Sequence, residues 1–73
     1  MSKLPVVSGA RAIRAFAKVG FVRVRQRGSH VTLKKDGFPV ILAVPLHDEL
    51  KPGTLRQFIR DAELTVEEFC DLL

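Results

Sequence analysis

Apolar and polar side chains along this chain change from a helical period to a period of two after the first twenty residues. Residues 9–19 have the helical spacing, with Ser8 as a helix N-cap and Gly20 as a helix stop, and therefore predict a helix. Its predicted apolar stripe is Ala10, Ile13, Phe16 and Ala17. Residues 21–27 then alternate between apolar and polar side chains, which is typical of a strand.

Two turn signals predict that this strand is the first of three. Gly28-Ser29 fits a two-residue hairpin with glycine at its first central position, leading into a strand over 30–35. Asp36-Gly37 is a type I′ turn signal, followed by an aliphatic strand over 38–44 with Pro39 near its start.

The last third of the chain predicts a loop over 45–51 and two helices. Pro52-Gly53-Thr54 opens the first of these helices, and Thr65 with Glu68 forms a capping box for the second. Their expected apolar faces are Leu55, Phe58, Ile59 and Ala62, and then Val66, Phe69, Cys70 and Leu73. We therefore expect one α+β domain over residues 1–73, ordered α-β-β-β-α-α, with helices on one face of a three-stranded antiparallel sheet.

Two-residue turns would also set the strand register. The expected pairs are Arg27–His30, Arg25–Thr32, Val24–Leu33 and Arg23–Lys34 in the first hairpin, and Lys35–Phe38, Leu33–Val40, Thr32–Ile41, Val31–Leu42 and His30–Ala43 in the second. This register sends the side chains of Val22, Val24, Val31, Leu33, Val40, Leu42 and Val44 toward the helices. It gathers Arg23, Arg25, Arg27, His30, Thr32, Lys34, Ile41 and Ala43 on the open face, with the small Ala43 leaving room beside His30.

The charge distribution makes this open face an expected anion-binding surface. Residues 1–35 contain nine basic residues and no acid, whereas residues 36–73 contain three basic residues and all eight acids. Nucleic acid, an anionic membrane and an acidic protein could each bind such a surface. The alternative is that the basic face is only solvated and binds no ligand.

Composition excludes several other classes of protein. A chain of 73 residues is too short for a large enzyme with a deep cleft, and a single cysteine, Cys70, excludes a disulfide framework or a multi-cysteine metal site. Its longest uncharged run, residues 37–47, is too short to span a membrane, and its start does not resemble a signal peptide. We expect a cytoplasmic protein without a metal or other cofactor.

His30 is the residue on this face with the most distinctive chemistry. A neutral imidazole can take the proton of a ribose 2′-hydroxyl, which then attacks the adjacent phosphate, while nearby arginines hold that phosphate. The alternative is an exposed histidine that only contacts phosphate.

Three ordered segments, together with Leu4-Pro5 and Ser8-Gly9, extend over nearly the whole chain. They are Gly20-Phe21 through Arg25-Gln26-Arg27 to Gly28-Ser29-His30-Val31; Val44-Pro45-Leu46-His47 with residues 49–55; and residues 62–69. On these segments the chain resembles the HicA (YcfA-like) family, the toxins of HicBA toxin–antitoxin pairs. The resemblance implies a double-stranded-RNA-binding-domain-like fold, a ribosome-independent endoribonuclease that cleaves mRNA, and neutralisation by a HicB-like antitoxin.

The resemblance also implies site residues. It places the catalytic histidine at His30, with Gly28 and Ser29 beside it. Gly28 and Ser29, together with the basic residues of the open face, form the expected RNA-binding set; these basic residues are Arg23, Arg25, Arg27 and Lys34. One departure is Glu63, where family members often have a glycine that suits a left-handed helix cap. Rival functions are a non-catalytic double-stranded-RNA-binding module and a module that docks an acidic protein.

Other residues have weaker claims to a function. His47 could approach the substrate, anchor its loop or contact the antitoxin, and Lys51 with the amides near Gly53 could hold a phosphate or simply cap a helix. Cys70 fits a packed thiol better than a nucleophile. Arg11, Arg14 and Lys18 form a basic face of the first helix, which could extend the RNA-binding surface of the sheet (the RNA track) or simply be solvated.

Overall fold

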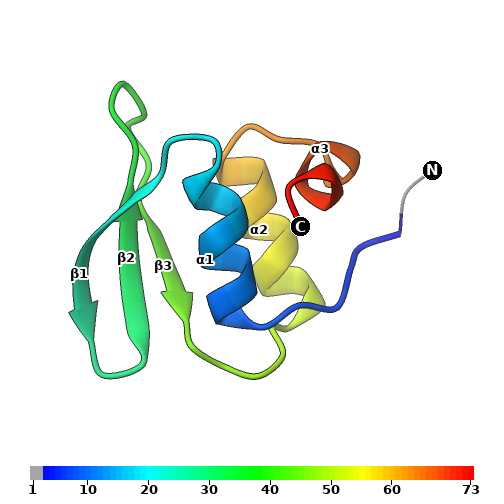
Figure 1. Ribbon diagram of the computed structural model, residues 1–73, viewed down its shortest axis with the longest axis horizontal. Coiled ribbons are helices and arrows are strands. Elements are labelled where there is room, and N and C mark those ends of the chain that lie inside the picture. Colours follow the sequence, from blue (N-terminus) through cyan, green and yellow to red (C-terminus); the bar gives the residue numbers. More distant parts are fainter. Residues whose placement is uncertain (1–2) are drawn as a thin grey trace.

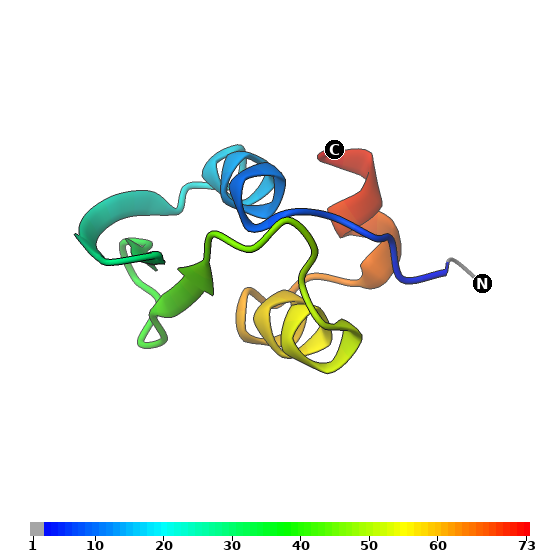
Figure 2. The ribbon, with the colours of Figure 1, turned by 90° about the horizontal axis from the view of Figure 1, so that it is seen from below.

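The computed structural model describes residues 3–73, which form one helix, a three-stranded sheet and two further helices (Figure 1). The elements are α1 (Gly9–Ala17), β1 (Val22–Arg27), β2 (His30–Lys34), β3 (Leu42–Pro45), α2 (Pro52–Asp61) and α3 (Val66–Asp71). The sheet is antiparallel with the order β1-β2-β3, and the helices lie to one side of it (Figure 2). The predicted α+β class and element order are confirmed.

Both ends of α1 are specified by the residues predicted from the sequence. The hydroxyl oxygen of Ser8 accepts a 3.1 Å hydrogen bond from the amide of Arg11. At the other end, Gly20 has a φ of +105°, and the amides of Gly20 and Phe21 donate to the carbonyls of Ala17 and Phe16. This is the bonding pattern of a Schellman cap, which needs a left-handed residue where glycine stands.

The buried face of α1 is rotated from the predicted stripe. Ala10 and Ala17 are exposed, whereas Ile13 and Phe16 are buried as expected. The buried residues of the helix are Gly9, Ala12, Ile13, Ala15 and Phe16. The prediction was wrong at the two alanines because small side chains spread around a short helix define its apolar face poorly.

Gly9 brings the start of α1 against the end of β3. Its amide donates a 2.9 Å hydrogen bond to the carbonyl of His47, and a Cβ atom at this position would overlap the carbonyl oxygen of Pro45. Only glycine allows this close approach of helix and strand.

The core lies between the helices and two of the three strands. Val31 and Leu33 of β2, together with Leu42 and Val44 of β3, are at most 1% exposed. Phe16 of α1 joins them to α3, because its ring centroid lies 5.1 Å from that of Phe69. Every residue of β1 is exposed, so this edge strand extends beyond the cover of the helices.

The first hairpin follows the predicted register only near its turn. Gly28 has a φ of +55°, and the predicted pairs Arg27–His30 and Arg25–Thr32 are confirmed. An irregularity between Arg23 and Arg25 then shifts the register. The predicted pairs Val24–Leu33 and Arg23–Lys34 are therefore wrong: the observed pairs are Arg23–Leu33 and Val22–Lys34.

The physical reason is that β1 buries no face. Val22 and Val24 are 59% and 54% exposed, so neither packs against the helices as predicted. Strand register is strongly specified only where one face is buried, and an extra residue costs little on an exposed edge.

The second hairpin is longer than predicted. The amide of Phe38 donates to the carbonyl of Lys35, and only Gly37 of the Asp36-Gly37 pair has a positive φ (+82°), so the predicted type I′ turn is wrong. The Phe38 ring leaves the strand to pack against Phe21 at a centroid distance of 5.8 Å, with the Lys35 amine 4.4 Å from the Phe38 centroid.

Pro39 has no amide hydrogen for the ladder, and β3 accordingly begins at Leu42 rather than near residue 38. The observed pairs are Leu33–Leu42, Thr32–Ala43, Val31–Val44 and His30–Pro45. All differ from the predicted pairs by two residues. An even shift leaves each side chain on its predicted face, so Leu42 and Val44 are buried while Ala43 is exposed.

The two C-terminal helices begin and end close to their predicted positions. Thr65 and Glu68 form the predicted capping box of α3. Leu55, Ile59 and Ala62 of the predicted α2 face are buried and Phe58 is half-buried, while Phe69 is the buried residue of α3.

The turn between α2 and α3 repeats the cap of α1 without its glycine. The amides of Glu63 and Leu64 donate to the carbonyls of Arg60 and Ile59, and Glu63 has a φ of +59°. The residue that departs from the expected glycine thus adopts the left-handed conformation itself, at a cost of about 1–2 kcal/mol.

Candidate functional site

His30 lies at the start of β2, immediately after the two-residue turn of the first hairpin. Its side chain is exposed, and no described residue forms a hydrogen bond with its imidazole. The turn is stabilised by Gln26, whose amide nitrogen donates a 3.0 Å hydrogen bond to the carbonyl of Gly28. The imidazole is therefore accessible on a defined hairpin end.

The face of the sheet that carries His30 is the one opposite the helices. Val31 and Leu33 of β2 point into the core, so the alternating residues His30, Thr32 and Lys34 point away from it. Directly opposed residues of antiparallel strands share a face, with Cβ atoms about 4.5–5.5 Å apart. Arg27 opposes His30 and Arg25 opposes Thr32, so both arginines share this face with the imidazole.

One predicted member of the basic stripe leaves the stripe, and a second has a different neighbour from the expected one. Arg23 opposes Leu33, a core-facing residue, and therefore leaves the row formed by Arg25 and Arg27. Lys34 is exposed on the predicted face, but its neighbour across the strand pair is Val22 instead of Arg23. Because of the irregularity between Arg23 and Arg25, a β-bulge, the arginine row beside His30 consists of two residues, Arg25 and Arg27.

The neighbour of His30 on β3 also differs from the predicted one. Pro45, not Ala43, opposes it on β3, and Pro45 is buried. The next residue, Leu46, donates its amide to the carbonyl of Ser29 at 2.6 Å, which joins the end of β3 to the hairpin turn. The predicted open space beside Ala43 therefore lies two residue pairs away, opposite Thr32, and a rigid proline stands opposite the imidazole.

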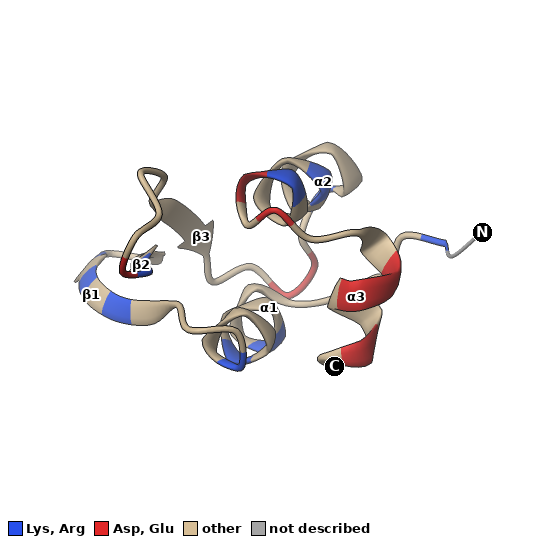
Figure 3. Ribbon diagram, turned by 90° about the horizontal axis from the view of Figure 1, so that it is seen from above, with Lys and Arg blue, Asp and Glu red and all other residues tan. Residues whose placement is uncertain are grey.

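Charge is separated along the molecule. Figure 3 shows lysine and arginine positions on β1, α1 and α2, whereas the charged positions of α3, at the end away from the sheet, are all aspartate or glutamate. An anion approaching the sheet would meet the positive end first.

Comparison with known proteins identifies the family. The sequence model for the HicA toxin of bacterial toxin–antitoxin systems matches residues 9–64 of the 73. The chain belongs to the HicA toxin family. The matched part runs from the start of α1 to the turn before α3 and includes His30 and the arginine row. No curated protein matches the chain.

The second histidine of this HicA-family chain has a structural contact through its backbone. The carbonyl of His47 accepts the amide of Gly9, and its side chain is exposed. This backbone bond anchors the loop and would form with any residue here, so it assigns no role to the His47 imidazole.

Lys51 and Cys70 show no geometry that singles them out. Lys51 is the N-cap residue of α2 and forms no side-chain capping bond. Cys70 is half-buried, and its sulfur lies 4.0 Å from the carbonyl oxygen of Lys3, which fits a packed thiol.

The basic face of α1 divides into two parts. Arg11 and Arg14 are exposed, whereas the amine of Lys18 donates a 2.7 Å hydrogen bond to the carbonyl of Leu72. Lys18 therefore joins α1 to the end of α3, a contact that sequence periodicity had no means of indicating.

Within residues 3–73, no three His, Cys, Asp or Glu side chains come together as a metal-binding group. Among the same residues, no helix has the length and hydropathy needed to cross a membrane.

Proposed function

We propose that this HicA-family toxin is an endoribonuclease that cleaves mRNA without a metal ion, with His30 as its acid/base residue. The observation that carries the proposal is the position of His30: exposed, directly opposite Arg27, on the face of the sheet that no helix covers. Arg25, one position further along this face, adds a second guanidinium.

The residues suit transesterification within the RNA strand. The neutral imidazole of His30 takes the proton of the ribose 2′-hydroxyl, and the 2′ oxygen attacks the adjacent phosphorus. The bond from phosphorus to the 5′ oxygen breaks, and the proton held by the imidazole is then available to that leaving oxygen. A 2′,3′-cyclic phosphate and a 5′-hydroxyl are the products.

The arginines have a separate role in this proposal. Guanidinium groups bind phosphate oxygens in a forked geometry, so Arg25 and Arg27 hold the scissile phosphate and stabilise the charge that develops on it. Gly28 and Ser29 form the turn that places the imidazole at the hairpin end, and Lys34 extends the positive surface. Arg23, turned out of the row by the bulge, contributes long-range attraction only.

A HicB-like antitoxin is the proposed partner, by family membership. We propose that it covers the His30 face, because blocking the imidazole and the arginines together would stop both binding and cleavage. As a toxin, this chain should arrest the growth of cells that express it, and co-expression of the product of an adjacent HicB-like reading frame should restore growth. Growth arrest that persists despite a stable complex of the two proteins would argue against this inhibitory role.

The direct test compares His30→Ala with His47→Ala on purified protein and single-stranded RNA. Loss of a general acid–base group costs about 10²–10⁴-fold in rate, so His30→Ala should lose cleavage while His47→Ala, a matched change of the other histidine, retains most of it. Full activity of His30→Ala would reject the assignment.

Two additional measurements identify the chemistry. DNA of the same sequence should bind but resist cleavage, because it has no 2′-hydroxyl, and EDTA should leave RNA cleavage unchanged. Salt-sensitive RNA binding with no cleavage by the natural chain would instead support a non-catalytic RNA-binding module. Strong inhibition by EDTA would show that the reaction requires a metal ion.

A further inference from the structure

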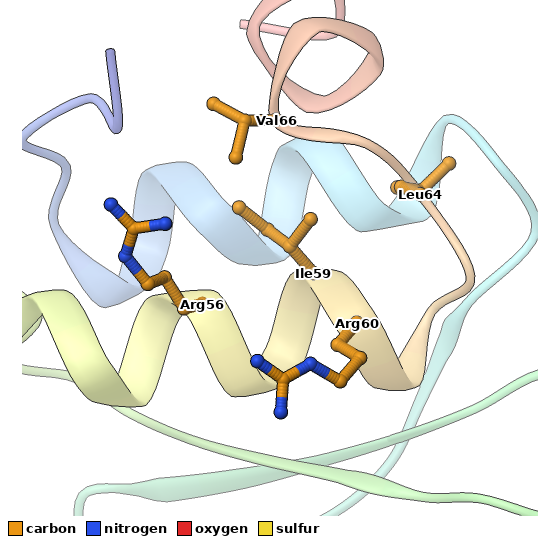
Figure 4. A pocket seen from close by; sticks show the side chains of 5 residues that line it. All are labelled: Arg56, Ile59, Arg60, Leu64 and Val66. Atoms are coloured by element: carbon orange, nitrogen blue, oxygen red, sulfur yellow. The ribbon is translucent and has the colours of Figure 1, made fainter. Parts of the chain in front are cut away.

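A groove opens between α2 and α3 (Figure 4). These two helices lie on the helical side of the molecule, away from the sheet (Figure 2). Its volume is about 210 Å³, and its lining consists of Arg56, Ile59, Arg60, Leu64 and Val66. None of these residues belongs to the proposed RNA-cleaving site.

The cap at the end of α2 builds the apolar floor of this groove. The amide of Leu64 returns to the carbonyl of Ile59, which places Leu64 beside Ile59 across the turn. Thr65 then starts α3, and Val66 forms the opposite wall. Ile59 is 3% exposed, while Leu64 and Val66 are half-buried, so the floor is aliphatic and contains no aromatic ring.

Two arginines one helical turn apart on α2 flank this floor. Arg56 and Arg60 are exposed, and within residues 3–73 neither guanidinium forms an ion pair. Figure 4 shows the Arg56 guanidinium on the Val66 side of the floor and Arg60 on the opposite side of Ile59.

Two carboxylates of the same segment form hydrogen bonds within the chain. Asp61 accepts a 2.8 Å hydrogen bond from the side chain of Gln57, and Glu68 accepts one of 2.8 Å from the amide of Thr65. Because neither guanidinium forms an ion pair within residues 3–73, both are available to an acid from outside the chain.

We propose that this groove binds a peptide segment of another protein, with an aliphatic side chain against Ile59 and a neighbouring carboxylate on Arg56 and Arg60. The apolar floor matches the aliphatic side chain, and each guanidinium offers a forked pair of donors that suits a carboxylate. The proposal goes beyond RNA cleavage, because the groove lies among the helices, whereas His30 lies on the sheet face turned away from the core.

A peptide is favoured over RNA by the charges around the groove. Residues 61–71 contain five acids, Asp61, Glu63, Glu67, Glu68 and Asp71, against no basic residue. These acids repel a polyanion along its length, whereas a single carboxylate needs only the two arginines. An aliphatic floor also provides no platform on which bases stack.

The experiment begins with selection of random dodecapeptides displayed on phage against the full chain carrying His30→Ala. The enriched peptides should share an aliphatic residue next to Asp or Glu. The best one, synthesised with capped ends, is then titrated by calorimetry against the same chain and against Arg56→Ala/Arg60→Ala. Because these assays contain no RNA and use the His30→Ala chain, they succeed or fail independently of the endoribonuclease proposal.

Affinity should fall at least about tenfold in the Arg56/Arg60 double variant, since both charge-assisted partners of the peptide carboxylate are lost. Arg11→Ala/Arg14→Ala removes the same charge from α1 and should change affinity less than about twofold. A second variant, Val66→Asp, places a carboxylate in the groove and should also abolish binding.

Several outcomes would overturn the proposal. They are an absence of enriched peptides, a consensus without acids, or equal affinity in the Arg56/Arg60 variant. Loss of RNA affinity in that variant alone would assign the groove to nucleic acid, and a change in mass by light scattering would assign it to a second copy of the chain.

Discussion

The amine of Lys18, at the end of α1, donates a 2.7 Å hydrogen bond to the carbonyl of Leu72, 54 residues later in the chain. The accepting carbonyl belongs to the C-cap residue of α3, where helix carbonyls have no intrahelical partner and a positive charge is favourable. This contact, together with the packing of Phe16 on Phe69, joins the last helix to the first.

Lys18→Ala should therefore act on stability more than on RNA. Removal of one exposed hydrogen bond with a charged donor should lower the free energy of unfolding by about 0.5–1.5 kcal/mol, measured by urea denaturation. Arg14→Ala, which removes an exposed charge from the same helix, is the control and should have a smaller effect. A large loss of RNA affinity with unchanged stability would show that Lys18 belongs to the RNA track instead.

Glu63→Gly should stabilise the fold. Glu63 adopts a φ of +59° in a cap whose counterpart on α1 uses Gly20, and relief of the left-handed strain should raise the free energy of unfolding by about 1 kcal/mol. For a domain of this size, that gain corresponds to a rise in Tm of roughly 4–8 °C.

Glu67→Gly provides the matched control, because it makes the same substitution within helix α3. There glycine should destabilise the chain by about 0.5–1 kcal/mol. If both substitutions change the Tm in the same direction, the left-handed cap is not the cause.

Gly9→Ala should be poorly tolerated. The added Cβ would overlap the carbonyl oxygen of Pro45, and separating α1 from β3 should cost about 1–3 kcal/mol of unfolding free energy. Gly53→Ala in α2 meets no atom within 4 Å and should instead be neutral or stabilising by up to about 1 kcal/mol. Denaturation of the two variants side by side measures the difference, and equal stabilities would contradict the close contact.

The bulge in β1 predicts that three arginines of one strand differ in importance. Arg25→Ala and Arg27→Ala should each lower RNA cleavage about tenfold or more, because each loses a guanidinium on the His30 face. Arg23→Ala should lower cleavage less, although it removes the same charge. The measurement is the initial rate of cleavage of one labelled RNA at constant salt.

Arg56→Ala, on α2 and not on the sheet, is the remote control for this series and should leave the rate nearly unchanged. An Arg23→Ala effect as large as that of Arg27→Ala would mean that the basic strand acts through its total charge and not through the row beside His30.

Features that depend on near neighbours were predictable from the sequence. Ser8 and Thr65 cap helices through atoms three residues away, and Gly20 and Gly28 supply left-handed conformations where a helix and a strand must turn. These signals were sufficient for the element order and for the position of His30 at a hairpin end.

Only the tertiary structure decided which residues stand beside His30. The second hairpin is longer than a two-residue turn, with the Phe38 ring packed on Phe21, so β3 is shifted by two residues and Pro45 stands opposite His30 in place of Ala43. The helices leave β1 uncovered, so its register is free to bulge and Arg23 leaves the arginine row. Strand pairing depends on contacts between distant residues, and the alternation of side chains specifies a face without specifying which pair of residues meets there.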